Sequence, residues 1–183
     1  MKGWKRHLLQ WDAKLSKALH ISDKHTIAAL VLKFFAHSGD SWFWLGGLFI
    51  TWLVTDGEWR ERVVFLGIGL SVMAVVVILL KFSIRRPRPN GEWGQIYRIT
   101  DPHSFPSGHA ARSAALAVMG IAVGPPWFAS LLVLWLPWVG LSRVALGVHY
   151  LSDVVAGWIV GAVMGLIALA LQPLILIIFS FLL

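Results

Sequence analysis

Long apolar stretches separated by short polar segments dominate the pattern of this sequence. Residues 63–80 contain no charged side chain, and longer uncharged stretches cover 113–142 and 154–183. Segments of about 20 apolar residues match the roughly 30 Å hydrocarbon core of a bilayer. The pattern therefore predicts membrane-spanning helices at 41–55, 60–81, 108–124, 127–146 and 151–175.

The N-terminal segment shows a different pattern. In residues 1–20, apolar side chains recur at helical spacing from Trp4 to Leu19, and lysines and arginines are available for the other face. This pattern predicts an amphipathic helix that lies on the membrane, and a packing helix of the bundle is the alternative. Residues 25–38 are apolar but short, and Lys33 interrupts them, so we interpret them as an interfacial or half-inserted helix.

The predicted fold is an all-α, polytopic transmembrane helix bundle of five to six spans. We expect one domain over 1–183, with an interfacial N-terminal segment over 1–38 and the helix bundle over 39–183. The composition agrees, because 57% of the residues are hydrophobic and only 14% are charged, whereas soluble domains are about a quarter charged. The absence of cysteine excludes disulfides and thiolate chemistry.

The net charge of +7 indicates an anionic partner. The cations lie beside hydrophobic spans and not on a soluble basic face, so we expect lipid headgroups or phosphate, and no nucleic acid. Counting five crossings places four segments at the same membrane face. Lys81 ends the second span, His109 begins the third, Arg143 ends the fourth and His149 begins the fifth.

The first polar block is "KFSIRRPRP" at 81–89. Lys81 and Arg88 bracket Arg85 and Arg86, and like charges at this density repel one another unless an anion neutralises them. A guanidinium offers a planar fork to phosphate oxygens, and an ammonium acts as a compact point charge. The alternative is a positive-inside cluster at a cytoplasmic helix end. Binding of a second phosphate or of lipid headgroups by Arg85 and Arg86 is a further hypothesis.

The second block is "PSGH" at 106–109. Ser107 is a candidate N-cap, and the free backbone N–H groups of a helix N-terminus bind anions. Gly108 permits close approach of a ligand, and His109 would face the same anion from the first turn. The alternative is a Pro-Ser turn followed by a solvated histidine.

The third block is "SRVALGVHYLSD" at 142–153. His149 and Asp153 are four residues apart, which predicts that they share one face of a helix. A carboxylate that binds one imidazole nitrogen fixes the tautomer and leaves the other nitrogen available for attack. The alternative is a weak surface pair. The charge of Arg143 on a span argues against that alternative, since such a charge costs about 2.5–3.5 kcal/mol on insertion scales.

Together the three blocks read K-x6-R-P, P-S-G-H and S-R-x5-H-x3-D over residues 81–153. This signature resembles that of the type 2 phosphatidic acid phosphatase family, whose membrane lipid phosphatases share it with the soluble vanadium haloperoxidases. The resemblance implies a metal-independent and cofactor-independent hydrolase for a lipid phosphate or diphosphate. Phosphatidic acid, phosphatidylglycerophosphate and polyprenyl diphosphates such as undecaprenyl diphosphate are the candidate substrates.

The resemblance also implies roles for individual residues. His149 is expected to be the nucleophile that forms a phosphohistidine, Asp153 to orient it, and His109 to act as the general acid. The residues expected to bind the phosphoryl oxygens are Lys81, Arg88, Ser107, Gly108 and Arg143, with Ser142 as a further motif position.

Several questions stay open at the level of sequence. The same residues would serve a lipid phosphotransferase, and a non-catalytic lipid-phosphate binder or transporter is a less favoured alternative because no internal repeat is present. The resemblance favours a multi-pass protein of the cell membrane with an extracytoplasmic site. With five spans, however, all but Arg60 and Arg62 of the 16 lysines and arginines lie on the side of the site, which favours the cytoplasm. If residues 25–38 also cross, the basic N-terminus joins Arg60 and Arg62 in the cytoplasm and the site faces outward. The lipid tail, the choice of monophosphate or diphosphate, and the oligomeric state are undetermined.

Overall fold

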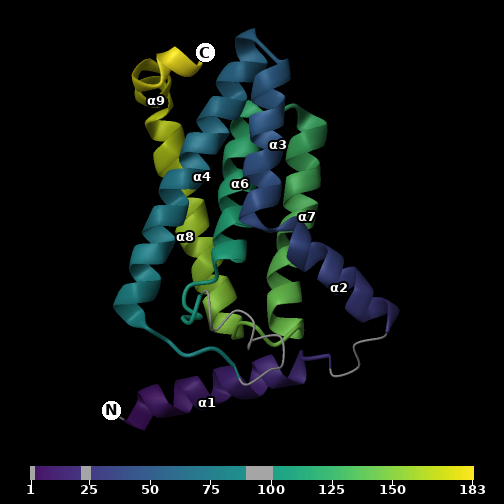
Figure 1. Ribbon diagram of the computed structural model, residues 1–183. Coiled ribbons are helices and arrows are strands. Elements are labelled where there is room, and N and C mark those ends of the chain that lie inside the picture. The colour runs from purple at the N-terminus through teal and green to yellow at the C-terminus, as the bar shows by residue number, and fades with distance from the viewer. Residues whose placement is uncertain (1–2, 22–25, 90–100) are drawn as a thin grey trace.

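A computed structural model describes residues 3–21, 26–89 and 101–183, and these form a bundle of helices without a β-strand (Figure 1). The predicted all-α bundle is thereby confirmed. The helices are α1 (Gly3–Ala18), α2 (Ile27–Ser38), α3 (Ser41–Val54), α4 (Gly57–Ile84), α6 (Gly108–Val123), α7 (Pro126–Ala145), α8 (Leu151–Ala170) and α9 (Gln172–Ile178), followed by a 3-10 turn η1 (Ser180–Leu182).

Three of these helices, α4, α7 and α8, are long and apolar enough to cross a membrane, and α2, α3 and α6 are shorter apolar helices. In Figure 1 the α3–α4 and α6–α7 turns lie at the upper end of the bundle. The last turn of α4, the first turn of α6, the end of α7 and the start of α8 lie at the lower end. The three polar blocks of the sequence therefore meet at one end of the bundle.

The N-terminal helix α1 lies across this same end (Figure 1). Its apolar stripe stays open, since Trp4, Leu8 and Trp11 are 59–61% exposed. Asp12 and Ser16, on a neighbouring face, accept hydrogen bonds from the backbone N–H groups of Ser152 and Leu151 at the start of α8. The interfacial position of α1 at the bilayer surface, with its apolar stripe in lipid, stays a prediction. The exposed stripe is compatible with it.

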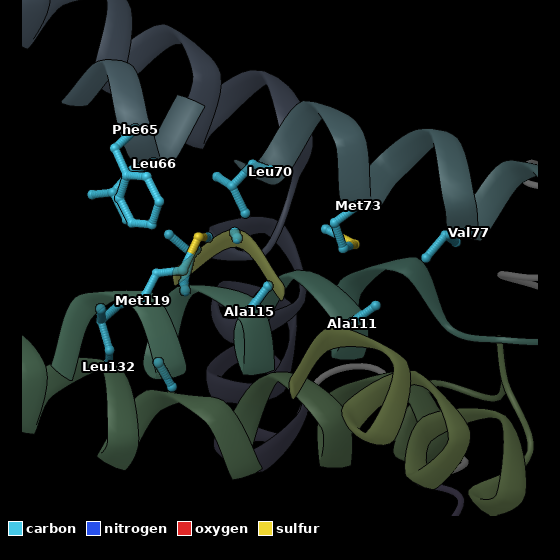
Figure 2. Close-up of a cluster of buried hydrophobic side chains, with 12 residues drawn as sticks. Phe65, Leu66, Leu70, Met73, Val77, Ala111, Ala115, Met119 and Leu132 are labelled. Atoms are coloured by element: carbon cyan, nitrogen blue, oxygen red, sulfur yellow. The ribbon is translucent and has the colours of Figure 1, made fainter. Parts of the chain in front are cut away.

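The core is built around α6, which contacts α8 most extensively and then α7 and α4. Figure 2 shows Phe65, Leu70 and Met73 of α4 directed at Ala115 and Met119 of α6. All five side chains are buried, with Leu70 3% exposed and the others at most 1%. This packing fixes the position of α6, and with it the position of the polar block at its N-terminus.

Glycine allows α8 to approach α6 closely. A Cβ atom added at Gly157 would lie 2.5 Å from the carbonyl oxygen of Ser107, and one at Gly161 would lie 2.0 Å from that of Ala111. Small residues spaced four apart are a common device for close helix contact in membranes, where packing and not the hydrophobic effect drives association. The contact holds the N-terminal ends of α6 and α8 together.

Two predicted boundaries differ from the structure. The span predicted over 151–175 is interrupted at Leu171, where α8 gives way to α9, because Pro173 in the first turn of α9 cannot donate a backbone hydrogen bond. The helix predicted over 60–81 continues to Ile84 and ends at Arg85, which adopts the left-handed conformation with φ 52°. Arg86 then precedes Pro87, and the clash with a following proline disfavours the helical conformation at such a residue.

Candidate active site

A cavity of about 340 Å³ opens at the end of the bundle where the three blocks meet. The helix α4 contributes apolar side chains such as Met73, Val77 and Phe82 to one wall. The other walls are polar. Six of the predicted site residues line the cavity, namely Lys81, Arg88, Gly108, His109, Arg143 and His149, together with Ser41, Asp101 and Arg112.

His149 is 2% exposed and lies in the turn between α7 and α8. The spacing of four residues predicted that His149 and Asp153 share one face of a helix, and this prediction is wrong, because α8 begins only at Leu151. The two side chains still approach, and His149 Nδ1 lies 3.5 Å from Asp153 Oδ2. Asp153 occupies the first turn of α8, and its Oδ2 accepts a hydrogen bond from the backbone N–H of Tyr150 at 2.9 Å.

The other nitrogen of His149, Nε2, lies 3.2 Å from Arg88 Nη1. A guanidinium can only donate, so Nε2 accepts and the proton of the neutral ring belongs on Nδ1, on the side of Asp153. This tautomer leaves the lone pair on Nε2. Burial, together with the positive charges of Arg88, Arg143 and Lys81, holds the pKa of His149 well below its usual value of 6.5. The ring is therefore neutral, and chemically able to act as a nucleophile, at neutral pH.

Arg86 holds Asp153 from the other side. Its Nη1 lies 2.8 Å from Asp153 Oδ1, and its Nη2 lies 2.6 Å from Asp12 Oδ2 of α1. Its guanidinium also lies over the ring of Tyr150 at 4.1 Å and donates to Ser152 Oγ. This arrangement argues against the hypothesis of a second phosphate at Arg86, because the carboxylates of Asp12 and Asp153 already neutralise its charge.

Lys81 and Arg88 form the cationic side of the cavity. The ammonium of Lys81 donates to Asp101 Oδ2 and, at 3.1 Å, to the carbonyl of His103. Arg88 Nη2 donates to the same Asp101 oxygen at 2.8 Å, and Arg88 Nε donates to the Asp101 carbonyl at 2.7 Å. Asp101 carries no motif role in the sequence analysis, yet it orients both cations.

His109 lines the same cavity as Lys81 and Arg88, from the first turn of α6. Ser107 is the N-cap predicted for this helix, with its hydroxyl accepting from the backbone N–H of Ala110 at 3.5 Å. The Ser107 backbone N–H donates to the Asp153 carbonyl at 2.9 Å, which joins the second block to the third. Ser107 is fully buried and supports the site from behind, while Gly108 and His109 line it.

Ser142 is placed differently from the other motif residues. Its hydroxyl is fully buried and donates to the carbonyl of Val139 at 2.7 Å, within α7. The neighbouring Arg143 is 2% exposed and lines the cavity. Arg143 is thus in a position to bind an anion, whereas the Ser142 hydroxyl is bonded to its own helix.

Asp40 is a site residue that the sequence motifs did not predict. It lies between α2 and α3, and its Oδ1 is 2.8 Å from His109 Nε2. The segment is anchored by Arg112 of α6, which donates to the carbonyl of Gly39 and to the hydroxyl of Ser41. In the sequence, Asp40 is an acidic residue in a polar break before an apolar helix, a pattern that is typical of a helix N-cap and does not signal a catalytic partner.

Among the described residues, no group of three or more histidine, aspartate or glutamate side chains could hold a metal ion. That the reaction needs no metal or other cofactor stays a prediction. The cationic side chains around the cavity can supply the positive charge that metal ions contribute in many phosphoryl-transfer enzymes.

Comparison with known proteins decides the family. The family model described as "PAP2 superfamily" matches residues 61–175, which contain all three blocks. The chain belongs to the PAP2 superfamily. The crystal structure of a PAP2 type phosphatidylglycerolphosphate phosphatase from Bacillus subtilis has the same fold, with a TM-score of 0.75 at 22% identity over 91% of this chain and 87% of that one. Its helices α4, α7 and α8 are long and apolar enough to cross a bilayer, and this PAP2 chain is a membrane protein.

Two curated relatives are similar in sequence. Decaprenylphosphoryl-5-phosphoribose phosphatase of Mycobacterium tuberculosis is 39% identical over 110 residues, which is 59% of this chain and 60% of the relative. Undecaprenyl-diphosphatase of Sulfolobus acidocaldarius is 28% identical over 160 residues, 83% of this chain and 74% of the relative. The chain thus spans about three fifths of the length of the mycobacterial relative.

Proposed function

We propose that this PAP2 protein is an integral-membrane, metal-independent phosphatase that hydrolyses a lipid phosphate or diphosphate through a phosphohistidine intermediate. The observation that carries the proposal is the shared cavity, because His149 and His109 line it together with Lys81, Arg88 and Arg143. A nucleophile, a proton donor and three cations around one space suit a phosphoryl group.

In the first step, the lone pair of His149 Nε2 attacks phosphorus, and the bond from phosphorus to the leaving oxygen breaks. The leaving oxygen keeps that electron pair and takes a proton from His109. Asp153 stabilises the positive charge that develops on the ring of His149. The cations of the cavity bind the equatorial oxygens, where charge is spread in the transition state.

In the second step, water attacks the phosphohistidine and gives a proton to His109. The P–N bond breaks, inorganic phosphate leaves, and His149 returns to its neutral form. One proton is released by His109 in the first step and regained in the second, so the two steps restore the enzyme.

The walls of the cavity and the names of the relatives support the proposed substrate class. Met73, Val77 and Phe82 of α4 form an apolar wall beside the cations, which suits a phosphate attached to a lipid. Both curated relatives carry names of phosphatases of polyprenyl-linked compounds. A polyprenyl or glycerolipid phosphate, with its tail left in the bilayer, is the substrate we propose.

We place the site at the extracytoplasmic face, as the family resemblance implies. The basic residues of α1 lie at the same end of the bundle and argue for the opposite side. A substrate that crosses membranes poorly, p-nitrophenyl phosphate, distinguishes an extracytoplasmic site from a cytoplasmic one. Intact cells that produce the protein should hydrolyse it faster than cells that produce the His149→Ala variant. A difference that emerges only after permeabilisation would place the site in the cytoplasm.

The central experiment uses purified protein in detergent with EDTA. Phosphate release is measured from short-chain phosphatidic acid, phosphatidylglycerophosphate and a polyprenyl diphosphate. In a single turnover with ³²P-labelled substrate, label should enter the protein in an acid-labile, alkali-stable form, as a phosphohistidine requires, and peptide mapping should place it on His149.

The matched variants are His149→Ala, which should release no phosphate, and His7→Ala, which changes an exposed histidine of α1 and should behave as the wild type. The mapping on wild-type protein does not depend on how well a variant folds. Phosphate release without labelled protein, or label on another residue, would contradict the phosphohistidine route. Added alcohols that take up the label in place of water would identify a phosphotransferase instead.

A further inference from the structure

The general acid of this site has a carboxylate partner of its own, outside the three sequence blocks. His109 Nε2 lies 2.8 Å from Asp40 Oδ1, and both side chains are largely buried, at 15% and 17% exposed. The second oxygen, Asp40 Oδ2, lies 3.2 Å from Nδ1 of His37, a side chain that is 61% exposed. A carboxylate therefore links an exposed imidazole to the buried one.

Asp40 is ionised in this arrangement. Burial alone would raise its pKa, but the hydrogen bonds and charges of His109 and His37 outweigh burial and lower the pKa of Asp40 to about 2. An ionised carboxylate only accepts hydrogen bonds, so His109 Nε2 carries a hydrogen and points at Asp40. The ring edge that is left to meet a substrate is the one with Nδ1.

The charges around the cavity make such a partner necessary. A general acid must carry its proton when the substrate arrives, and an imidazole is then positive. Arg112 and Arg143 line the same cavity, and their charges oppose a further positive charge on His109. The negative charge of Asp40 offsets them at hydrogen-bond distance.

The segment that carries Asp40 is held in place by α6 itself. Arg112 lies one turn beyond His109 and donates to the Gly39 carbonyl and the Ser41 hydroxyl, on both sides of Asp40. The approach is close, since a Cβ atom at Gly39 would lie 3.0 Å from His109 Cδ2 and 2.9 Å from Val139 Cγ1. Asp40 and His109 are thus fixed relative to one another by two independent contacts.

We propose that Asp40 is the positioning residue of the general acid, holding His109 by Nε2 so that Nδ1 delivers the proton to the leaving oxygen. The site then contains two His–Asp pairs with separate tasks. Asp153 serves the nucleophile His149, and Asp40 serves the acid His109. This inference rests on the proposed phosphatase function.

The test exploits the chemistry of the leaving group. An alkoxide leaves only if it is protonated, whereas p-nitrophenolate is a stable anion that needs no acid. The rate of phosphoenzyme formation is measured in single turnovers with octyl phosphate and with p-nitrophenyl phosphate. Asp40→Asn should slow the reaction of octyl phosphate on the order of 10²-fold, the lower end of what a positioned acid contributes, and that of p-nitrophenyl phosphate far less.

The matched control is His37→Gln, which removes the exposed partner of Asp40 and leaves the pair of Asp40 with His109 intact. It should retain the wild-type ratio between the two substrates. A second measurement adds Asp40→Asn to a His109→Gln background, where it should slow octyl phosphate no further, because Asp40 acts through His109.

Equal slowing of both substrates by Asp40→Asn, or additive losses in the double variant, would overturn the inference and leave Asp40 a purely structural residue. A different result would contradict the proposed phosphatase function: the wild-type protein itself would form no phosphoenzyme with either substrate.

Discussion

Replacing Gly161 by alanine should push apart α6 and α8, the two helices that carry His109 and Asp153. A Cβ atom at this position would lie 2.0 Å from the carbonyl oxygen of Ala111, 2.7 Å from its carbonyl carbon and 2.8 Å from its Cα. These are backbone atoms of α6, so no side chain can rotate away to relieve the contact. An ordinary van der Waals separation begins near 3.4 Å, and the helices must therefore shift by roughly 1 Å.

The shift has two measurable effects. Overpacking of this kind costs about 1–3 kcal/mol of stability, so the Tm in detergent should fall by several degrees. The N-terminal end of α6 carries His109, and α8 carries Asp153. A displacement of about 1 Å between reacting groups costs on the order of 10²-fold in rate, so kcat/KM for a lipid phosphate should fall by a comparable factor.

The matched control is Gly67→Ala on α4, where an added Cβ atom would meet nothing within 4 Å. This variant should keep the wild-type Tm and kcat/KM, or gain slightly in stability because alanine favours the helix by up to about 1 kcal/mol over glycine. If Gly161→Ala and Gly67→Ala behaved alike in both measurements, the contact between α6 and α8 would not be what positions the site.

Three further predictions concern Asp153 and the nucleophile His149. Arg86→Gln leaves Asp153, which is fully buried, without its charge partner. Breaking a buried ion pair costs about 3–5 kcal/mol of stability, so the Tm should fall. We also expect a lower kcat with KM preserved. Asp12→Asn keeps Asp153 paired with Arg86 and should lower the Tm and kcat less than Arg86→Gln does. A larger loss in Asp12→Asn than in Arg86→Gln would contradict this prediction. Burial and neighbouring cations lower the pKa of His149, so lowering the pH inactivates the nucleophile only below its usual value of 6.5. The acid limb of kcat/KM, after correction for the titration of the substrate, should therefore lie below pH 6.5, and a limb at or above that value would be inconsistent with a neutral buried ring. Between pH 6.5 and the lowered pKa, His149 is protonated in the unfolded chain and neutral in the folded protein. The free energy of unfolding should therefore fall as the pH falls through this range.

The helical bundle could be predicted from the sequence because a bilayer leaves few alternatives. Backbone polar groups must be satisfied within each apolar segment, so an uncharged stretch such as 63–80 has to be a helix. The helix start at Ser107 could also be predicted, since a serine N-cap acts through bonds to residues close in sequence. The five predicted spans coincide with helices to within a few residues, apart from the break at Leu171.

The common location of Lys81, Arg88, His109, Arg143 and His149 followed from counting crossings, because the ends of successive spans alternate between the two faces. Their convergence on one cavity agrees with that count. The count could not place His149 in a turn outside α8, because a spacing of four residues has the same appearance in a helix and in a turn that leads into one.

Partners that meet only in the folded bundle had no local signal in the sequence. Asp40 meets His109 across 69 positions of the chain, and Arg86 joins Asp12 to Asp153 across 74 and 67 positions. Apolar runs and capping residues act over one or two helical turns, so the order of residues determines them. Ion pairs between distant parts of the chain depend on how far each helix, with the segments at its ends, is rotated and shifted against its neighbours. This is decided by packing such as that of Gly161 on Ala111.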